Sequence, residues 1–152
     1  MKASENLRSL NITLPNAPKP VGAYVAHKKI GKIVYISGQL PIGPNGNIMK
    51  GKIGSDLTLE DGQKAAYLCT LNILSQIKDS CEGNIDKVKN CIKITGFVNS
   101  TDDFVDQPKV INPASETITA VLGDKGKHAR AAVSCNSLPL GIAVEIDAIF
   151  EI

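Results

Sequence analysis

Residues 128–152 read HARAAVSCNSLPLGIAVEIDAIFEI, two alternating segments separated by a turn. The second segment alternates apolar and polar side chains and would turn four apolar ones to one side of a strand: Val144, Ile146, Ala148 and Phe150. The first segment alternates in the same way, and its apolar side carries Ala131, Val133 and Cys135. Pro139 and Gly141 are typical of a turn. The stretch therefore predicts a C-terminal β-hairpin.

The register of this hairpin follows from the alternation. A turn centred on residues 139–140 pairs Ser134 with Glu145 and Arg130 with Ile149, which collects the apolar side chains on one face. A shift by one residue would place Glu145 among the core residues, so the register is well specified. Arg130 and Glu145 then share the other face, about 13 Å apart along the ladder.

That predicted face carries groups suited to a small anion. A guanidinium is a planar fork that matches a carboxylate, and a glutamate orients or deprotonates a water. We expect Arg130 and Glu145 to hold opposite ends of a small molecule, with Asp147 as a third acidic candidate. An arginine and a glutamate on an outward strand face are also common as solvated charges, and the pattern alone leaves that alternative open.

The composition is typical of one globular domain. The chain has 152 residues, enough to bury a core, and 43% of them are hydrophobic. Seventeen basic and 15 acidic residues give a net charge of +2, too balanced to indicate a nucleic-acid partner. No apolar run reaches membrane-spanning length and the N-terminus lacks a signal-peptide core, so we expect a cytoplasmic protein without a membrane partner.

The cysteines show no spacing typical of metal ligands. They lie within apolar segments, so we expect reduced thiols in or near the core: Cys69, Cys81, Cys91 and Cys135. The sequence therefore predicts no metal site and no nucleophilic role for Cys135.

The N-terminal part is predicted as an extension, residues 1–20, ahead of a domain that covers residues 21–152. Residues 4–10 are expected to form a short helix with Ser4 as its N-cap. Three prolines follow and make an extended connector: Pro15, Pro18 and Pro20.

A first hairpin is predicted from residues 21–27 and 32–39. The run at 33–36 is nearly continuous in apolar residues, as in a strand that is covered on both faces. Gly38 near the strand end would let a ligand approach the backbone closely, although a bulge or a strand end explains a glycine equally well.

Two helices and a third strand follow. Residues 59–80 have a helical apolar stripe and begin with a capping box made by Thr58 and Asp61. Residues 87–100 are predicted as a strand whose first face carries Val88, Ile92, Ile94 and Val98. For the second helix we favour a start at Pro113 with Asn112 as its N-cap, and the alternative is a start near Pro108 with a kink at Pro113.

The element order is strand-strand-helix-strand-helix-strand-strand, which favours an α+β fold with helices on one face of a mixed sheet. The other face then needs cover from water or from sister subunits. The apolar run at 33–36 favours subunits.

Four segments resemble, in order and spacing, the Rid family, also called YjgF or reactive intermediate imine deaminase proteins, with endoribonuclease L-PSP-like members. The segments are VGAYV at 21–25, ISGQLP at 36–41, HAR at 128–130, and LP at 138–139 followed by EIDAI at 145–149. The resemblance implies a chorismate-mutase-like α+β fold with two helices on one face of the sheet. It also implies a homotrimer with ligand clefts between subunits.

The resemblance further implies a deaminase that hydrolyses 2-imino acids or their enamine tautomers to 2-keto acids and ammonia without a cofactor. Arg130 is implied to hold the substrate carboxylate and Glu145 to position or activate water. The implied substrate-binding residues are Tyr24, Gly38, Asn112 and Ala132.

The chain also departs from the family pattern. Ala132 stands where many deaminase members carry cysteine, the N-terminal extension is long, and residues 106–108 look inserted. These features indicate a longer branch, in which a non-catalytic trimeric binding protein for small carboxylate metabolites is an alternative. An endoribonuclease ranks third, because the chain has no basic stripe and no paired histidines. His128 is open as a catalytic or a packing residue.

Overall fold

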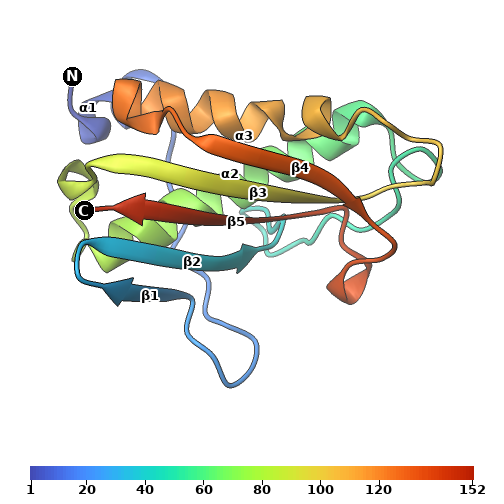
Figure 1. The fold of residues 1–152 in the computed structure, drawn as a ribbon, viewed down its shortest axis with the longest axis horizontal. Helices are drawn as coiled ribbons and strands as arrows, with labels where there is room; N and C mark the ends of the chain where they lie inside the picture. The colour runs from blue at the N-terminus through green and yellow to red at the C-terminus, as the bar shows by residue number, and fades with distance from the viewer.

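A five-stranded mixed sheet forms the centre of the protein, whose computed structural model describes residues 1–152 (Figure 1). The strand order is β1-β2-β5-β3-β4, and only β3 and β4 run parallel to each other. The strands are β1 (His27–Ile30), β2 (Ile33–Gln39), β3 (Asn90–Asn99), β4 (Ala129–Cys135) and β5 (Val144–Glu151).

The predicted C-terminal hairpin is wrong, although both of its strands exist. β5 lies between β2 and β3, and β4 lies at the sheet edge beside β3. Arg130 is paired with Ile94 instead of Ile149, and Glu145 with Phe97 instead of Ser134. The alternation specifies which residues of a strand share a face, but it does not specify the neighbouring strand. The helix between β3 and β4 allows them to pair in parallel, which a short turn does not.

Two long helices, α2 (Leu59–Ser80) and α3 (Gln107–Leu122), cover one face of the sheet (Figure 1). α2 packs against β2 and β5, and α3 packs against β3 and β4. The expected architecture, an α+β fold with two helices on one face, is confirmed. No helix has both the length and the apolar composition needed to cross a bilayer.

The bounds predicted for α2 are confirmed, and so is its capping box. Asp61 N–H donates to Thr58 Oγ1 at 3.1 Å, and the Asp61 carboxylate accepts from Thr58 N–H at 2.9 Å. These two bonds satisfy backbone donors that the first turn would leave unpaired.

The favoured start of the second helix is wrong, because α3 begins at Gln107 and continues through Pro113. Proline lacks an N–H, so the carbonyl four residues earlier, that of Lys109, loses its helical partner. Gln63 of α2 donates its Nε2 to this carbonyl at 3.0 Å. A tertiary hydrogen bond thus replaces the missing helical one, and Asn112 lies inside the helix instead of capping it.

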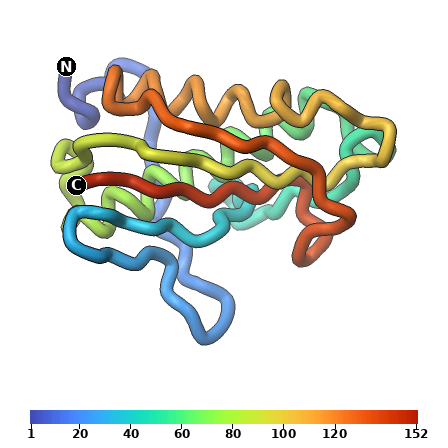
Figure 2. The backbone as a smooth tube through the Cα atoms, in the orientation of Figure 1, coloured from blue at the N-terminus to red at the C-terminus, as the bar shows by residue number.

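The first predicted strand is also wrong. Residues 21–26 form no strand, and β1 starts only at His27. Gly22 has φ of 130°, outside the extended region, and Tyr24 is 50% exposed. The chain between α1 (Ala3–Ser9) and β1 instead crosses behind the sheet and forms a loop that projects beyond β1 (Figure 2).

A bulge in β3 changes the predicted faces at its start. The register shifts between Cys91 and Lys93, so Cys91 is buried and Ile92 is 39% exposed. Val88 lies before the strand, after the 3₁₀ turn Ile85–Lys87. Ile94 and Val98 face the helices as expected, since both are fully buried.

The predicted N-terminal helix is confirmed as α1, but Lys2 is its N-cap. Ser4 instead donates from its backbone N–H and its Oγ to Asp86, at 2.9 and 2.8 Å. Asn6, 8% exposed, donates to the Val121 carbonyl at the end of α3 at 2.8 Å. The extension therefore packs on the helical layer, and a boundary at residue 20 stays a prediction.

Candidate functional site

Arg130 projects from β4 onto α3. Its Nη1 donates to Asn112 Oδ1 at 3.0 Å and to Ser115 Oγ at 3.2 Å, and its Nη2 approaches the Pro108 carbonyl at 3.5 Å. These three acceptors are spaced four and three residues apart, so they follow one face of the helix. The guanidinium is thereby held in one orientation.

His128 completes this arrangement from the other side of Ser115. Its Nδ1 lies 2.6 Å from the Gly126 carbonyl, and its Nε2 lies 2.9 Å from Ser115 Oγ. A carbonyl only accepts, so the hydrogen-bond network assigns the ring proton to Nδ1, and Nε2 accepts the Ser115 hydroxyl. The Ser115 oxygen is then free to accept from Arg130. His128 acts in this chain through Ser115 on the position of Arg130.

A guanidinium has five N–H donors, and the contacts above use three of them. The remaining donors lie on Nε and Nη2 and have no partner within the chain. Two neighbouring N–H groups on one planar group are suited to bind a carboxylate through two parallel bonds.

Glu145 and Gly38 form a second group of predicted site residues. A register shift between Ile36 and Gln39 places Gly38 in an irregular part of β2, beside Glu145 on β5. A Cβ built on Gly38 would lie only 2.8 Å from the Glu145 Cδ. The glycine thus allows the carboxylate to lie directly against the backbone of β2.

The carboxyl of Glu145 is half-buried, and this burial raises its pKa above the ordinary value, with Asp147 nearby adding to the rise. A carboxyl group in this state holds its proton more strongly than an exposed one. Once ionised, it is therefore a better base than an exposed carboxylate.

Tyr24 belongs to the same group. It lines a pocket of about 80 Å³ together with Gly38, and apolar side chains form much of the wall. The wall includes Val21, Leu40, Ile42, Ile48 and Leu140.

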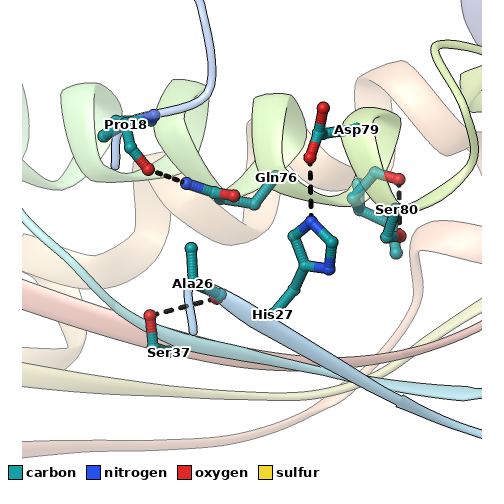
Figure 3. A network of polar contacts seen from close by, with 8 residues as sticks. Pro18, Ala26, His27, Ser37, Gln76, Asp79 and Ser80 are labelled. Carbon is teal, nitrogen blue, oxygen red and sulfur yellow. Dashed lines mark hydrogen bonds and ion pairs between the residues drawn. The ribbon is translucent and has the colours of Figure 1, made fainter. Parts of the chain in front are cut away.

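Buried polar side chains of α2 hold the segment that carries Tyr24 (Figure 3). Gln76 Nε2 donates to the Pro18 carbonyl at 2.6 Å, and Ser75 Oγ donates to the Pro15 carbonyl at 2.9 Å. His27, where β1 begins, is paired with Asp79 at 2.9 Å. Residues 75, 76 and 79 share one side of the helix, so a single polar stripe of α2 fixes the path of the chain into the pocket.

The two groups lie on opposite faces of the sheet, contrary to the prediction that Arg130 and Glu145 share a face. Arg130 is level with Ile94 of β3, and Glu145 with Phe97, three residues away. Successive side chains of a strand alternate between faces, and Ile94 is fully buried under the helices. Arg130 therefore faces the helical layer and Glu145 faces away from it.

Ala132 and Asn112 belong with Arg130. Ala132 is level with Gly96, whose missing side chain would meet Ile111 of α3, so Ala132 also faces the helices. The predicted apolar side of β4, with Val133 at its centre, consequently faces away from the helices. The candidate site residues therefore form two groups on opposite faces of the sheet, and one chain does not bring the two groups together.

No group of three or more His, Cys, Asp or Glu side chains is arranged to hold a metal ion. Three of the cysteines are buried, and burial raises the pKa of Cys91 to about 12. Such a thiol stays protonated at neutral pH and is a poor nucleophile.

A family model described as "YjgF/chorismate_mutase-like, putative endoribonuclease" matches residues 5–150. The chain belongs to the YjgF family. Its sheet and helices are accordingly those of the chorismate-mutase-like fold, as the sequence motifs implied.

Similar proteins support this placement. Protein TCP17 of Trypanosoma cruzi is 41% identical, over 99% of this chain and 94% of that protein. The crystal structure of Atu1372 from Agrobacterium tumefaciens superposes with a TM-score of 0.90 at 44% identity, over 99% of this chain and 93% of that one.

Two more distant relatives have a described activity or a bound ligand. The 2-iminobutanoate/2-iminopropanoate deaminase of Escherichia coli is 28% identical, over 93% of this chain and 96% of that protein. The crystal structure of E. coli TdcF with bound serine has a TM-score of 0.65 at 26% identity, over 90% of this chain and 94% of that one. The YjgF family thus includes imine deaminases, and a protein of similar structure has been crystallised with a bound amino acid.

Sequence reasoning missed Ser115, which contacts both Arg130 and His128. Its spacing of three residues from Asn112 on one helix was an available signal, but it required the helix to start before Asn112.

Proposed function

We propose that the protein is a deaminase that hydrolyses 2-imino acids, or their enamine tautomers, to 2-keto acids and ammonia. The observation that carries the proposal is the fixed guanidinium of Arg130, which keeps two N–H groups without a partner in the chain. A deaminase of this kind and a serine-bound structure among the YjgF relatives support a substrate that carries a carboxylate.

The second half of the site comes, in this proposal, from another copy of the chain. Arg130, Asn112 and Ala132 belong to one half-site, and Glu145, Gly38 and Tyr24 to the other, on the opposite face of the sheet. The helix-free face also exposes apolar side chains that a copy would cover, among them Tyr35 and Val133. We infer a homotrimer in which each cleft uses one half-site from each of two neighbours.

The chemistry requires little beyond placement of the substrate. Arg130 binds the carboxylate, and the protonated C=N carbon is already electrophilic. Glu145 accepts a proton from water while the water oxygen bonds to this carbon and the π electrons move to nitrogen.

The second half of the reaction returns that proton. Glu145 protonates the amine, and the C–N bond breaks with its electron pair on nitrogen. The hydroxyl oxygen then forms the carbonyl and releases its proton to ammonia. Imine cation and water thereby give 2-keto acid and ammonium, and no step requires a cofactor.

The test is ammonia release from freshly generated 2-iminopropanoate. We expect turnover above the uncatalysed rate by the natural protein and a loss of about 100-fold or more in Arg130→Ala, since paired charge-assisted bonds to the carboxylate disappear. The variant should keep its oligomeric state by light scattering.

Failure of the natural protein to accelerate ammonia release would remove the proposal. If the natural protein then binds pyruvate and Arg130→Ala does not, the protein is a binding protein for small carboxylates. The alanine at position 132, in place of a cysteine, favours this alternative.

A further inference from the structure

Leu140 has a left-handed backbone, with φ of 60° and ψ of 9°. Only two other non-glycine residues have a positive φ, Asn11 and Glu82, and each directly follows the C-cap of a helix. A leucine is disfavoured in this region because its Cβ crowds the backbone, whereas glycine and asparagine adopt it readily. The chain therefore keeps a residue at position 140 that the backbone does not favour.

The surrounding turn does not explain this choice. It is held by backbone hydrogen bonds from Gly51 N–H to the Gly141 carbonyl at 2.9 Å and from Ala143 N–H to the Met49 carbonyl at 3.1 Å. A further bond joins Gly141 N–H to the Leu138 carbonyl at 3.0 Å. None of these bonds requires a leucine side chain, so the turn would form equally well around asparagine or glycine.

The side chain of Leu140 does not stabilise the core either, since the residue is 59% exposed. It lines the pocket of about 80 Å³ that Tyr24 and Gly38 also line. A strained residue with an exposed apolar side chain at a ligand pocket is typical of a functional position. Two independent observations, the backbone conformation and the position of the side chain, thus point to the same role.

We propose that Leu140 is a specificity-determining residue that packs against an aliphatic side chain of the substrate. This inference rests on the proposed function. With the carboxylate on Arg130 of a second copy and the C=N group near Glu145, the substrate side chain extends into the pocket. A volume of about 80 Å³ leaves room for a side chain of a few carbon atoms.

The composition of the wall sets the chemical class. Apolar side chains such as Val21 and Ile42 form much of it, and the Ser37 hydroxyl and the Gln39 amide nitrogen, which also line it, already donate to carbonyls within the chain. The preferred substrates are 2-imino acids with aliphatic side chains, such as the imine derived from leucine, over the imine derived from alanine.

The experiment compares the natural protein with Leu140→Asn. Asparagine is similar in size and tolerates the left-handed backbone, but it removes the apolar contact. Imines are generated from leucine and from alanine by an amino-acid oxidase, and kcat/KM is measured for each. We expect the leucine-to-alanine ratio to fall about tenfold, the scale of a lost apolar contact in a specificity pocket. The melting temperature should stay level or rise by a few degrees, because the strain is relieved.

Leu10→Asn is the matched control. Leu10 is exposed at the end of α1 and does not line the pocket. The leucine-to-alanine ratio of kcat/KM in Leu10→Asn should therefore equal that of the natural protein. An unchanged ratio in an active Leu140→Asn variant would overturn the inference and leave the deaminase proposal intact. Equal losses on both imines with a changed oligomeric state would also overturn it, since they would assign Leu140 to subunit contact. No turnover of either imine by the natural protein would be a failure of the proposed function.

Calorimetry with two keto acids tests Leu140 without turnover. We expect Leu140→Asn to weaken binding of 4-methyl-2-oxopentanoate about tenfold more than binding of pyruvate. Equal weakening of both would contradict the inference.

Discussion

The carboxylate of Glu145 lies in the space that any side chain at position 38 would need. A Cβ on Gly38 would be 2.8 Å from Cδ and 3.0 Å from Cγ of Glu145, and closer still to Oε1. The two residues belong to neighbouring strands, β2 and β5, near the irregular part of β2. The absence of a side chain at position 38 thus sets the place of the half-buried carboxylate.

Gly38→Ala should therefore reduce catalysis and leave the fold intact. The added methyl group meets the far end of a flexible glutamate, which moves aside at little energetic cost. Displacing a catalytic group by about 1 Å lowers kcat about 100-fold. We expect this loss in ammonia release, with a melting temperature close to that of the natural protein.

Gly96→Ala, unlike Gly38→Ala, should lower the stability of the protein. Its Cβ would lie 2.5 Å from Cδ1 and 2.6 Å from Cγ1 of Ile111, a fully buried residue of α3 that has no room to move. Overpacking of this kind costs about 1–3 kcal/mol. Urea unfolding should show the loss in Gly96→Ala, and an equal loss in Gly38→Ala would refute the distinction between the two glycines.

Glu145→Gln should become more stabilising as the pH rises. Burial, with a smaller contribution from Asp147, raises the pKa of Glu145 in the folded protein. The folded state thus binds the proton more tightly than the unfolded state, so the stability linked to this group is present below the unfolded pKa and is lost as the pH rises through the folded pKa. Glutamine does not ionise, so the stability of the variant lacks this dependence on pH.

Urea midpoints measure this difference. We expect the variant to match the natural protein near pH 4 and to exceed it near pH 7, on either side of a raised glutamate pKa. A variant less stable than the natural protein at neutral pH would contradict the assigned direction of the pKa.

Local features of the sequence were sufficient to predict that the two long helices and most of the strands exist. α2 combines a capping box at Thr58 with a long apolar stripe, and both features act within one element. The bounds of α3 failed because the consequence of Pro113 depends on Gln63 from another helix, which a local pattern does not contain.

The order of the strands in the sheet could not be predicted from the sequence patterns. β4 and β5 are neighbours in the chain, and their alternation fits a hairpin, yet β3 lies between them. The family motifs supplied the candidate site residues, but the assumed hairpin placed Arg130 and Glu145 on the same face. Pairing through β3 places them on opposite faces, which is incompatible with the single-chain site of the assumed hairpin and compatible with the cleft between subunits that the family resemblance implied.

Gln76→Ala tests the attachment of the Tyr24 segment. Gln76 is 1% exposed, and its bond to the Pro18 carbonyl is one of few that fix the chain before β1. Loss of about 1 kcal/mol should loosen residues 19–25, raise KM for 2-iminopropanoate about fivefold and expose this segment to limited proteolysis.

Gln63→Ala is the control on the same helix, since it also removes one side-chain bond to a carbonyl, that of Lys109. We expect it to lower the melting temperature without raising KM. Equal KM values in the two variants would show that Gln76 contributes only to overall stability.

Mixed oligomers test whether each site joins two chains. Arg130→Ala and Glu145→Gln should each be inactive alone, because each lacks one half-site. In oligomers refolded from an equal mixture, about one quarter of the clefts should combine an intact Arg130 from one copy with an intact Glu145 from its neighbour. Ammonia release should then recover to about one quarter of the natural rate. A mixture that forms hetero-oligomers by native mass spectrometry and yet shows no recovery would place both groups in a site within one chain, against the opposite faces on which the sheet holds them.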